Sequence, residues 1–248
     1  QKNVELILTD LVAEFAESDY EPLLCEYKIG MGGGHAPLVL DLPAGGHAML
    51  RGIADRVDIC RAGGKTYLRV VDYKTGKKLF RESDLEKGKN LQLLIYLFTL
   101  CRVADAAFLD LVGAGSTDAL VPAGATYYVV KPPTVKRDAP PAAEADIPAE
   151  AAGMLGRSGF ILDSEALGHM IDRTEKKVFS KSLTRKDAGE MDALFDTVQT
   201  AIAKLAGDMR AGRIDCAGTA RGANGPCRYC DYAAVCRMNP TKGDEDDA

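Results

Sequence analysis

The spacing of apolar residues along the chain predicts four helices, one of them near Asp163–Met170. From Val4 to Phe15, apolar residues recur three and four positions apart, acidic residues lie on the other side, and Pro22 follows. The same spacing runs from Asp187 to Arg210 and predicts a long helix there. A third helix is expected from Asn90, a favourable N-cap residue, to Val103.

Short runs of alternating or β-branched apolar residues predict six strands. They are Leu23–Ile29, Leu38–Leu42, His47–Arg51, Gly52–Cys60, Thr66–Tyr73 and Ala125–Val130. Glycines between the fourth and fifth of these strands suit a tight hairpin. The order of strands, helix, strand and helices predicts a mixed α/β domain.

Composition and charge are those of an ordinary soluble domain. The chain has 248 residues, of which 46% are hydrophobic and 27% charged. Its longest apolar run, Leu93–Leu100, is too short to span a bilayer, and we expect no membrane partner. The net charge of −5 argues weakly against nucleic acid, because four of the acids lie in the tail Gly243–Ala248. Since Gln1 opens directly in a helical pattern, we expect the chain to be part of a longer protein.

The seven cysteines are an odd number without a secretory signal, which favours free thiols and a reducing cytoplasm. Cys25, Cys60 and Cys101 lie singly in apolar patterns and are expected to be buried. Cys227 and Cys230, with Cys236 six residues on, crowd into a segment with few apolar residues. A metal-held element is therefore expected there, although a CxxC pair alone serves zinc, redox and iron–sulfur chemistry alike.

The stretch VVDYKTGKK places an aspartate and a lysine at the end of a predicted strand. Side chains alternate along a strand, so Asp72 and Lys74 share one face and Tyr73 points to the other. The hairpin brings Asp55, from the segment GIADRVD, beside this strand. Two converging carboxylates favour a cation between them, and oxygen ligands suit Mg²⁺ or Mn²⁺. Lys74 is then placed to act on an attacking water and on a phosphate.

Gln92 and Tyr96 are four residues apart on the predicted helix and share a face. A glutamine in the apolar run NLQLLIYLF suggests a specific hydrogen bond. Ordinary ion pairs also account for the acids: Asp72 with Lys74, and Asp55 and Asp58 with Arg51 and Arg56. The sequence GGKT at 63–66 is not a phosphate loop, because a P-loop needs glycine where Ile59 stands.

Taken together, G-x-x-D, VVDYKTG and Q-L-x-x-Y resemble the PD-(D/E)XK nuclease family in its RecB-like branch. Within that branch the chain is most similar to the C-terminal nuclease domains of AddB-type subunits of bacterial helicase–nucleases. The stretches LRGIADRVD, YLRVVDYKTG, LQLLIYLFTL and PCRYCDYAAVCR carry the resemblance. It implies a restriction-endonuclease-like fold over residues 1–221, a mixed central sheet flanked by helices. A cysteine-rich segment, 222–240, and a disordered acidic tail, 241–248, are expected to follow.

The resemblance also implies roles for individual residues. Asp55 and Asp72 hold the Mg²⁺ or Mn²⁺ ion. The backbone carbonyl of Tyr73 is a further ligand, and Lys74 is the catalytic lysine. Gln92 supports the catalytic site. DNA contacts are expected from Tyr96, Lys77 and Lys78.

The family usually adds an acidic residue or histidine from an upstream helix. Glu14, Glu17 and Glu26 are the candidates here, unless the residue lies before Gln1.

The cysteine segment resembles one that binds a 4Fe–4S cluster through Cys227, Cys230 and Cys236, with a fourth cysteine far upstream. Cys216 is the only nearby substitute. The implied function is a Mg²⁺-dependent exodeoxyribonuclease domain that works on DNA with a partner subunit in repair and recombination of double-strand breaks. A nuclease-fold module for DNA binding or subunit docking is the alternative, and a zinc-binding regulatory module is a third.

Overall fold

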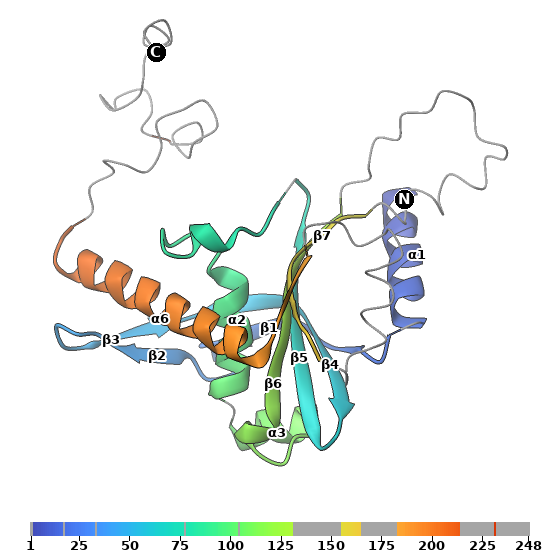
Figure 1. Cartoon of the computed structure of the whole chain (residues 1–248), viewed down its shortest axis with the longest axis horizontal. Coiled ribbons are helices and arrows are strands. Elements are labelled where there is room, and N and C mark those ends of the chain that lie inside the picture. The colour runs from blue at the N-terminus through green and yellow to red at the C-terminus, as the bar shows by residue number, and fades with distance from the viewer. Residues whose placement is uncertain are drawn as a thin grey trace, which may run out of the picture. The chain divides into compact units, whose positions relative to one another are not determined.

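A mixed β-sheet organises the described part of the chain (Figure 1). The computed structural model describes residues 2–16, 18–32, 34–76, 78–103, 105–130, 155–164, 183–213 and 231. Within these ranges six strands form one sheet in the order β1-β4-β5-β6-β7-β8, and β2 and β3 form a separate hairpin. The strands are β1 Glu21–Ile29, β2 Leu38–Asp41, β3 His47–Leu50, β4 Gly52–Ala62, β5 Lys65–Lys74, β6 Leu120–Val129, β7 Arg157–Leu162 and β8 Leu183–Lys186.

Helices lie on both faces of the sheet, which confirms the predicted mixed α/β fold (Figure 1). They are α1 Lys2–Ala16, α2 Gln92–Arg102, α3 Ala106–Val112 and α6 Ala188–Arg210, with short 3-10 turns at Glu82–Asp84 and Thr117–Ala119. The main hydrophobic core lies between the sheet and the helices α2, α3 and α6, where Leu97, Phe98 and Phe195 are buried. A smaller apolar cluster packs α1 against the other face through Leu6, Val71 and neighbouring side chains.

The strand β5 lies between an antiparallel neighbour, β4, and a parallel neighbour, β6. It pairs antiparallel with β4 through a hairpin whose glycines, Gly63 and Gly64, have φ of +57° and +73°. It pairs parallel with β6, and α2 and α3 form the crossover between these two strands. The predicted hairpin is therefore confirmed: Gly63 and Gly64 of GGKT form its turn, and Lys65 and Thr66 begin β5.

Several predicted boundaries differ from the structure. The first strand starts at Glu21, and Pro22 lies inside it, which is tolerated because β1 is an edge strand. Asn90 is not the N-cap of α2. Its φ is +59° and its side chain donates a hydrogen bond to Asp84 Oδ2 at 3.1 Å, so the helix begins two residues later. The patterns did not predict α3, β7 or β8.

Other predictions fall outside the described residues. They concern the helix near Asp163–Met170, of which the structure describes only Asp163 and Ser164, the cysteine segment apart from Asp231, and the acidic tail 241–248. The chain divides into two units, residues 1–206 and 207–248, and the proposed boundary at 221 stays a prediction. No helix in the described ranges has the length and apolar character needed to cross a membrane.

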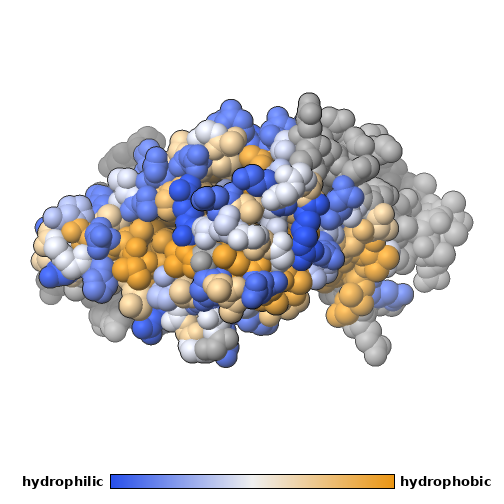
Figure 2. Space-filling view, turned by 90° about the horizontal axis from the view of Figure 1, so that it is seen from below, coloured by the Kyte–Doolittle hydropathy of each residue, from blue (hydrophilic) through white to orange (hydrophobic). Residues whose placement is uncertain are grey.

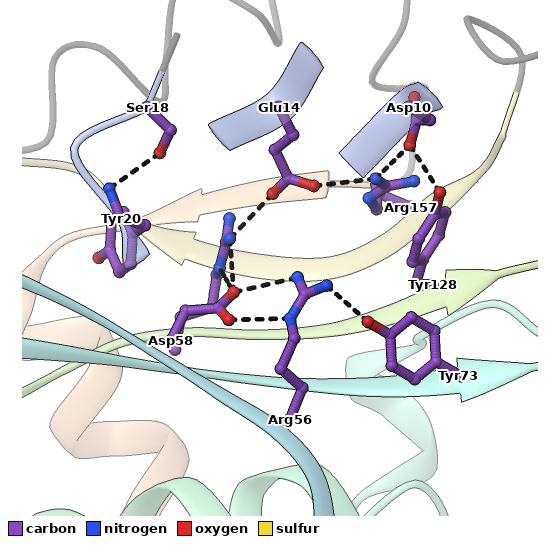
Figure 3. Close-up of polar contacts among 10 residues, drawn as sticks. Asp10, Glu14, Ser18, Tyr20, Arg56, Asp58, Tyr73, Tyr128 and Arg157 are labelled. Carbon is purple, nitrogen blue, oxygen red and sulfur yellow. Dashed lines mark hydrogen bonds and ion pairs between the residues drawn. The ribbon is translucent and has the colours of Figure 1, made fainter. Parts of the chain in front are cut away.

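A buried network of charges fixes α1 to the sheet (Figure 3). Glu14 of α1 lies 2.8 Å from Arg69 Nη2 of β5 and 2.9 Å from Arg157 Nη2 of β7. Asp10, one turn earlier, lies 2.5 Å from the same Arg157 nitrogen and accepts a hydrogen bond of 2.7 Å from the Tyr128 hydroxyl. Two acids of α1 thus bind side chains from three strands.

The network continues along β4. Asp58 accepts hydrogen bonds from Arg69 at 2.6 and 2.9 Å, and Arg56 Nε lies 2.8 Å from its other oxygen. The network therefore contains three arginines and three acids, and each has an opposite charge as a partner. Buried charges are tolerated in this arrangement, whereas removal of one partner costs about 3–5 kcal/mol.

The outer face of α1 has a different character. Val4, Leu8 and Val12 follow one another at four-residue spacing and are exposed. Figure 2, seen from below, shows apolar side chains at the right-hand end, on the side where Figure 1 places α1. Because the outward side of α1 is also apolar, the buried charges on its inner side are what specify which face meets the sheet.

The first prediction concerns acid stability and Glu14. Burial by itself raises the pKa of Glu14, but Arg69, Arg157 and Arg56 outweigh it and lower the pKa from 4.5 to about 2. A lowered pKa adds stability that is present above pH 4.5 and is lost as the pH falls toward 2, a contribution of roughly 3 kcal/mol. Glu14→Gln is expected to lower the free energy of unfolding at pH 6. The difference in this free energy between the variant and the parent should become smaller as the pH falls.

Urea unfolding between pH 6 and pH 3 measures this difference. Glu5→Gln, an exposed acid on the same helix, is the control and should follow the parent at every pH. If the loss of unfolding free energy in Glu14→Gln were the same at every pH, the lowered pKa of Glu14 would not be a source of stability.

Candidate active site

Two carboxylates converge where the β4–β5 ladder ends. The antiparallel register runs to the pair Arg56 and Val71, and one further step places Asp55 opposite Asp72. Asp55 Oδ2 accepts a hydrogen bond of 2.9 Å from the backbone N–H of Tyr73. The hairpin thus holds Asp55 beside Asp72, as the sequence predicted.

Asp72 is an unusual aspartate because its side chain is only 3% exposed. Burial raises its pKa, the carboxylate of Asp55 raises it further, and Lys74 and Lys78 oppose this effect. Lys74 forms an ion pair with Asp72 Oδ2, which confirms that the two side chains share a face. Tyr127, paired with Asp72 across the parallel register, has a pKa raised to about 12 by burial and by the charge of Asp72.

A pocket of about 410 Å³ opens beside Lys74. Its described lining has an aromatic and apolar part and a polar part without carboxylates. The ammonium groups of Lys74 and Lys78 lie 5.7 and 5.3 Å from the centre of the Tyr127 ring. Other polar side chains of the lining come from Arg51, Asn90, Gln92 and Tyr96. The pocket therefore offers positive charge and ring faces next to the buried aspartate.

Gln92 and Tyr96 are both in this pocket, at the start of α2. Gln92 Nε2 donates a hydrogen bond of 3.3 Å to the Tyr96 hydroxyl, which is a specific partner of the kind the sequence suggested. The Tyr96 ring packs directly on Gly52, where any Cβ atom would overlap it. The glycine that opens β4 is therefore required for α2 to approach the strand.

The donor set fits a small divalent cation. Asp55 and Asp72 bring two carboxylates together, and Mg²⁺ is commonly held by one or two carboxylates while it keeps several waters. Within the ranges that the structure describes, no group of three or more acid, histidine or cysteine side chains is placed to hold a metal. The protein ligands offered here are therefore few, and they leave positions for water and substrate.

The three upstream acids are placed differently. Glu14 is bound by Arg69 and Arg157 on the other face of the sheet, away from Asp72. Glu17 lies outside the described residues. Glu26 falls at the register position opposite Asp55 and has a φ of +50°, a strained value for a residue other than glycine. Of the two acids that the structure describes, Glu26 is the one whose register position is beside Asp55.

The simpler ion-pair explanation holds for Asp72, which pairs with Lys74, and for Asp58, but not for Asp55. Asp58 pairs with Arg56 and Arg69 in the buried network, whereas Asp55 accepts its hydrogen bond from a backbone N–H. Lys77 and the three clustered cysteines lie outside the described residues, so their roles stay predictions. Of the cysteines expected to be buried, Cys60 and Cys101 are, and Cys25 is exposed.

Sequence reasoning missed Tyr127 and Arg51 as pocket residues. A signal for Tyr127 existed, because a helical crossover after β5 predicts a parallel neighbour whose residues lie beside Asp72. Arg51 has no such signal. It lies between β3 and β4, and the fold brings it to the same pocket as Gln92 and Tyr96 of α2.

Comparison with known proteins agrees with this geometry. Residues 2–237 match the model of the PD-(D/E)XK nuclease superfamily. Relatives named as a subunit of an ATP-dependent helicase/deoxyribonuclease are 30% identical over 257 residues in Desulforudis audaxviator and 29% over 258 residues in Moorella thermoacetica. These alignments cover 97% of this chain and 21% of each relative. One from Clostridium acetobutylicum is 27% identical over 92% of this chain and 20% of its own length.

The chain thus spans about a fifth of the length of these curated relatives. The family match covers nearly the whole chain. This chain belongs to the PD-(D/E)XK nuclease superfamily.

Proposed function

We propose that this chain is a nuclease domain that hydrolyses phosphodiester bonds of DNA with Mg²⁺ or Mn²⁺. The observation that carries the proposal is the convergence of Asp55 and Asp72 at one strand end, with Lys74 beside them in a positively charged pocket. Neither a second carboxylate next to the buried Asp72 nor a partly exposed lysine is needed to stabilise the sheet. Both suit the hydrolysis of a phosphate ester.

Each side chain has a distinct task in this proposal. Asp55 and Asp72 hold the cation, with the Tyr73 carbonyl as a further ligand. The ion supplies Lewis-acid stabilisation of charge on the phosphate and lowers the pKa of bound water. Lys74, released from its ion pair with Asp72, orients the attacking water and neutralises charge on the phosphate. Gln92 holds the Tyr96 hydroxyl and supports the wall of the pocket.

DNA is expected to enter through the pocket beside Lys74. Arg51 and Lys78 of the lining, together with Lys77, are proposed to bind backbone phosphates, and Tyr96 is proposed to contact the DNA from the pocket wall. Acids of the neighbouring loop are partly neutralised within the protein, because Glu82 lies 2.9 Å from Lys186 Nζ. The net charge of the chain is negative, yet the described lining of this pocket is positive.

The wider setting is proposed from the named relatives. Their name describes one subunit of an ATP-dependent helicase/deoxyribonuclease, so we propose a partner subunit for this protein as well. In that setting the domain acts as an exodeoxyribonuclease on the ends of double-strand breaks, in the cytoplasm. Helicase work would be done elsewhere in the complex.

A second candidate is a nuclease-fold module with weak catalysis that binds DNA or docks a subunit. The direct ion pair between Lys74 and Asp72 favours this candidate, because it occupies both groups. Divalent ions decide between the two functions. In an active nuclease, Asp55 and Asp72 would hold a divalent ion and Lys74 would be free to act on water and phosphate. In a binding module, added divalent ions would cause no cleavage.

The second prediction separates activity from stability at Asp72. Asp72→Asn is expected to reduce metal-dependent cleavage by about 100-fold or more, since the ion supplies several kcal/mol of transition-state stabilisation. The same change should not lower the free energy of unfolding. A raised carboxylate pKa means that the charged form is disfavoured in the folded state above that pKa, and asparagine removes this cost.

Cleavage assays with Mg²⁺ and with EDTA, together with urea unfolding at pH 7, test both parts. Asp110→Asn, an exposed aspartate on α3, is the control. Parent-like cleavage by Asp72→Asn would show that the catalytic assignment is wrong.

The third prediction separates Lys74 from the metal ligands. Lys74→Met is expected to keep Mg²⁺ or Mn²⁺ binding and to lose turnover by about 100- to 10,000-fold, the usual contribution of general acid–base catalysis. Calorimetry gives the metal affinity and single-turnover cleavage gives the rate. Lys65→Met, at the opposite end of β5, is the matched control. If Lys74→Met abolished metal binding in a folded protein, the division of roles would be refuted.

The fourth prediction concerns Cys227, Cys230 and Cys236. We propose that they hold a 4Fe–4S cluster together with a fourth cysteine of the complete protein, as the resemblance implies. The complete protein, prepared without oxygen, is then expected to contain iron and to show the broad absorption of cluster thiolates at roughly 400 nm. Serine at any of the three positions should bleach this absorption. A colourless protein that contains zinc would favour the regulatory zinc module instead.

A further inference from the structure

Two successive residues of β4, Asp55 and Arg56, each form a hydrogen bond with Tyr73 of β5. Asp55 binds the backbone N–H of Tyr73, with 2.9 Å between Oδ2 and N. Arg56 binds the side chain of the same tyrosine, with 2.6 Å between Nη1 and the hydroxyl oxygen. The ring of Tyr73 also packs against Tyr128 at 5.5 Å between centroids. One residue of β5 is thus fixed by its backbone and by its side chain.

These two hydrogen bonds connect β4 and β5 beyond the last residue pair of their regular ladder. The register between β4 and β5 is regular up to the pair Arg56 and Val71, and Tyr73 lies two residues beyond it. Tyr73 is also the residue between Asp72 and Lys74. Its peptide plane therefore fixes the orientation of both neighbours, while its N–H fixes the carboxylate of Asp55.

Arg56 can act as a rigid support because its own position is fixed. Its guanidinium is buried, with Nε 2.8 Å from Asp58 Oδ1 and Nη2 3.0 Å from Asp58 Oδ2 (Figure 3). Asp58 is bound in turn by Arg69, which binds Glu14 of α1. A planar guanidinium can serve Asp58 and Tyr73 at once, whereas a lysine ammonium cannot reproduce this geometry.

From these contacts we infer that Arg56 and Tyr73 are positioning residues for the metal site, and that the Tyr73 hydroxyl acts on Asp55 and Asp72 from the opposite face of the sheet. The inference rests on the proposed function, since it concerns the same carboxylates. Neither side chain touches the cation or the DNA. Their effect is to keep the two carboxylates at a fixed separation before the ion binds, so that binding does not have to order the strand end.

The fifth prediction tests the hydroxyl with Tyr73→Phe, which keeps the ring and the backbone carbonyl. Calorimetry with MnCl₂, without DNA, is expected to show an affinity about 10-fold weaker than the parent, the lower end of the effect of residues that support metal ligands. Cleavage by the complete native protein should need about 10-fold more Mn²⁺ for half-maximal rate. At saturating Mn²⁺ the rate should return close to that of the parent, with KM for DNA unchanged.

Tyr128→Phe is the matched control. It removes a tyrosine hydroxyl from the same network, but this hydroxyl bonds to Asp10 and not to Arg56. Tyr128→Phe is expected to lower the melting temperature and to leave the Mn²⁺ affinity as in the parent. A purely structural role of Tyr73 would instead make the two variants alike in both measurements.

Arg56→Lys extends the test, because this substitution keeps a positive charge for Asp58. It should weaken Mn²⁺ binding as Tyr73→Phe does, and the double variant should be no weaker than either single variant, since both changes break the same bond. Tyr73→Phe with parent-like Mn²⁺ affinity, or strictly additive effects, would overturn the inference. A parent protein that binds no Mn²⁺ would refute the proposed function. A parent that binds Mn²⁺, with Tyr73→Phe of equal Mn²⁺ affinity, would refute only this inference.

Discussion

The hydrogen-bonded ion pair between Asp58 and Arg69 is the interaction on which the rest of this structure depends. The two residues lie on adjacent strands, directly opposite in the register, and both are almost completely buried. Arg69 extends from this pair to Glu14 and so docks α1, while Asp58 holds Arg56. Buried charges demand complete pairing, and this demand determines which face of α1 meets the sheet and how the strands β4 and β5 are aligned.

The buried charges on the two faces of β5 have different surroundings. On the face toward α1, every buried charge in the network has an opposite charge within hydrogen-bonding distance. On the face toward α2, Asp72 is buried next to a second carboxylate, and its pKa is raised. The first arrangement stabilises the fold, whereas in the second, burial and the neighbouring carboxylate disfavour the charged form of Asp72, and Lys74 and Lys78 oppose this effect. A strand that is held firmly on one side can tolerate this repulsion on the other.

The same contrast explains why the site lies at a strand end. The regular ladder stops at Arg56 and Val71, so Asp55 and Tyr73 are free to use side-chain contacts. Gly52 lets Tyr96 approach the start of β4, and the parallel strand β6 brings Tyr127 beside Asp72. The pocket is therefore assembled from a hairpin, a crossover helix and a parallel neighbour, which are distant from one another along the chain.

The sequence by itself determined the helices α1, α2 and α6, the β4–β5 hairpin, and the common face of Asp72 and Lys74. These features follow from local periodicity and from the two-residue repeat of a strand. Only the tertiary structure decided the partners of the charged residues. Glu14 and Glu26 are both acids near the N-terminus, yet one is bound by two arginines and the other lies beside Asp55. Local pattern does not encode this difference, because it depends on which strands are neighbours and on which face each side chain lies.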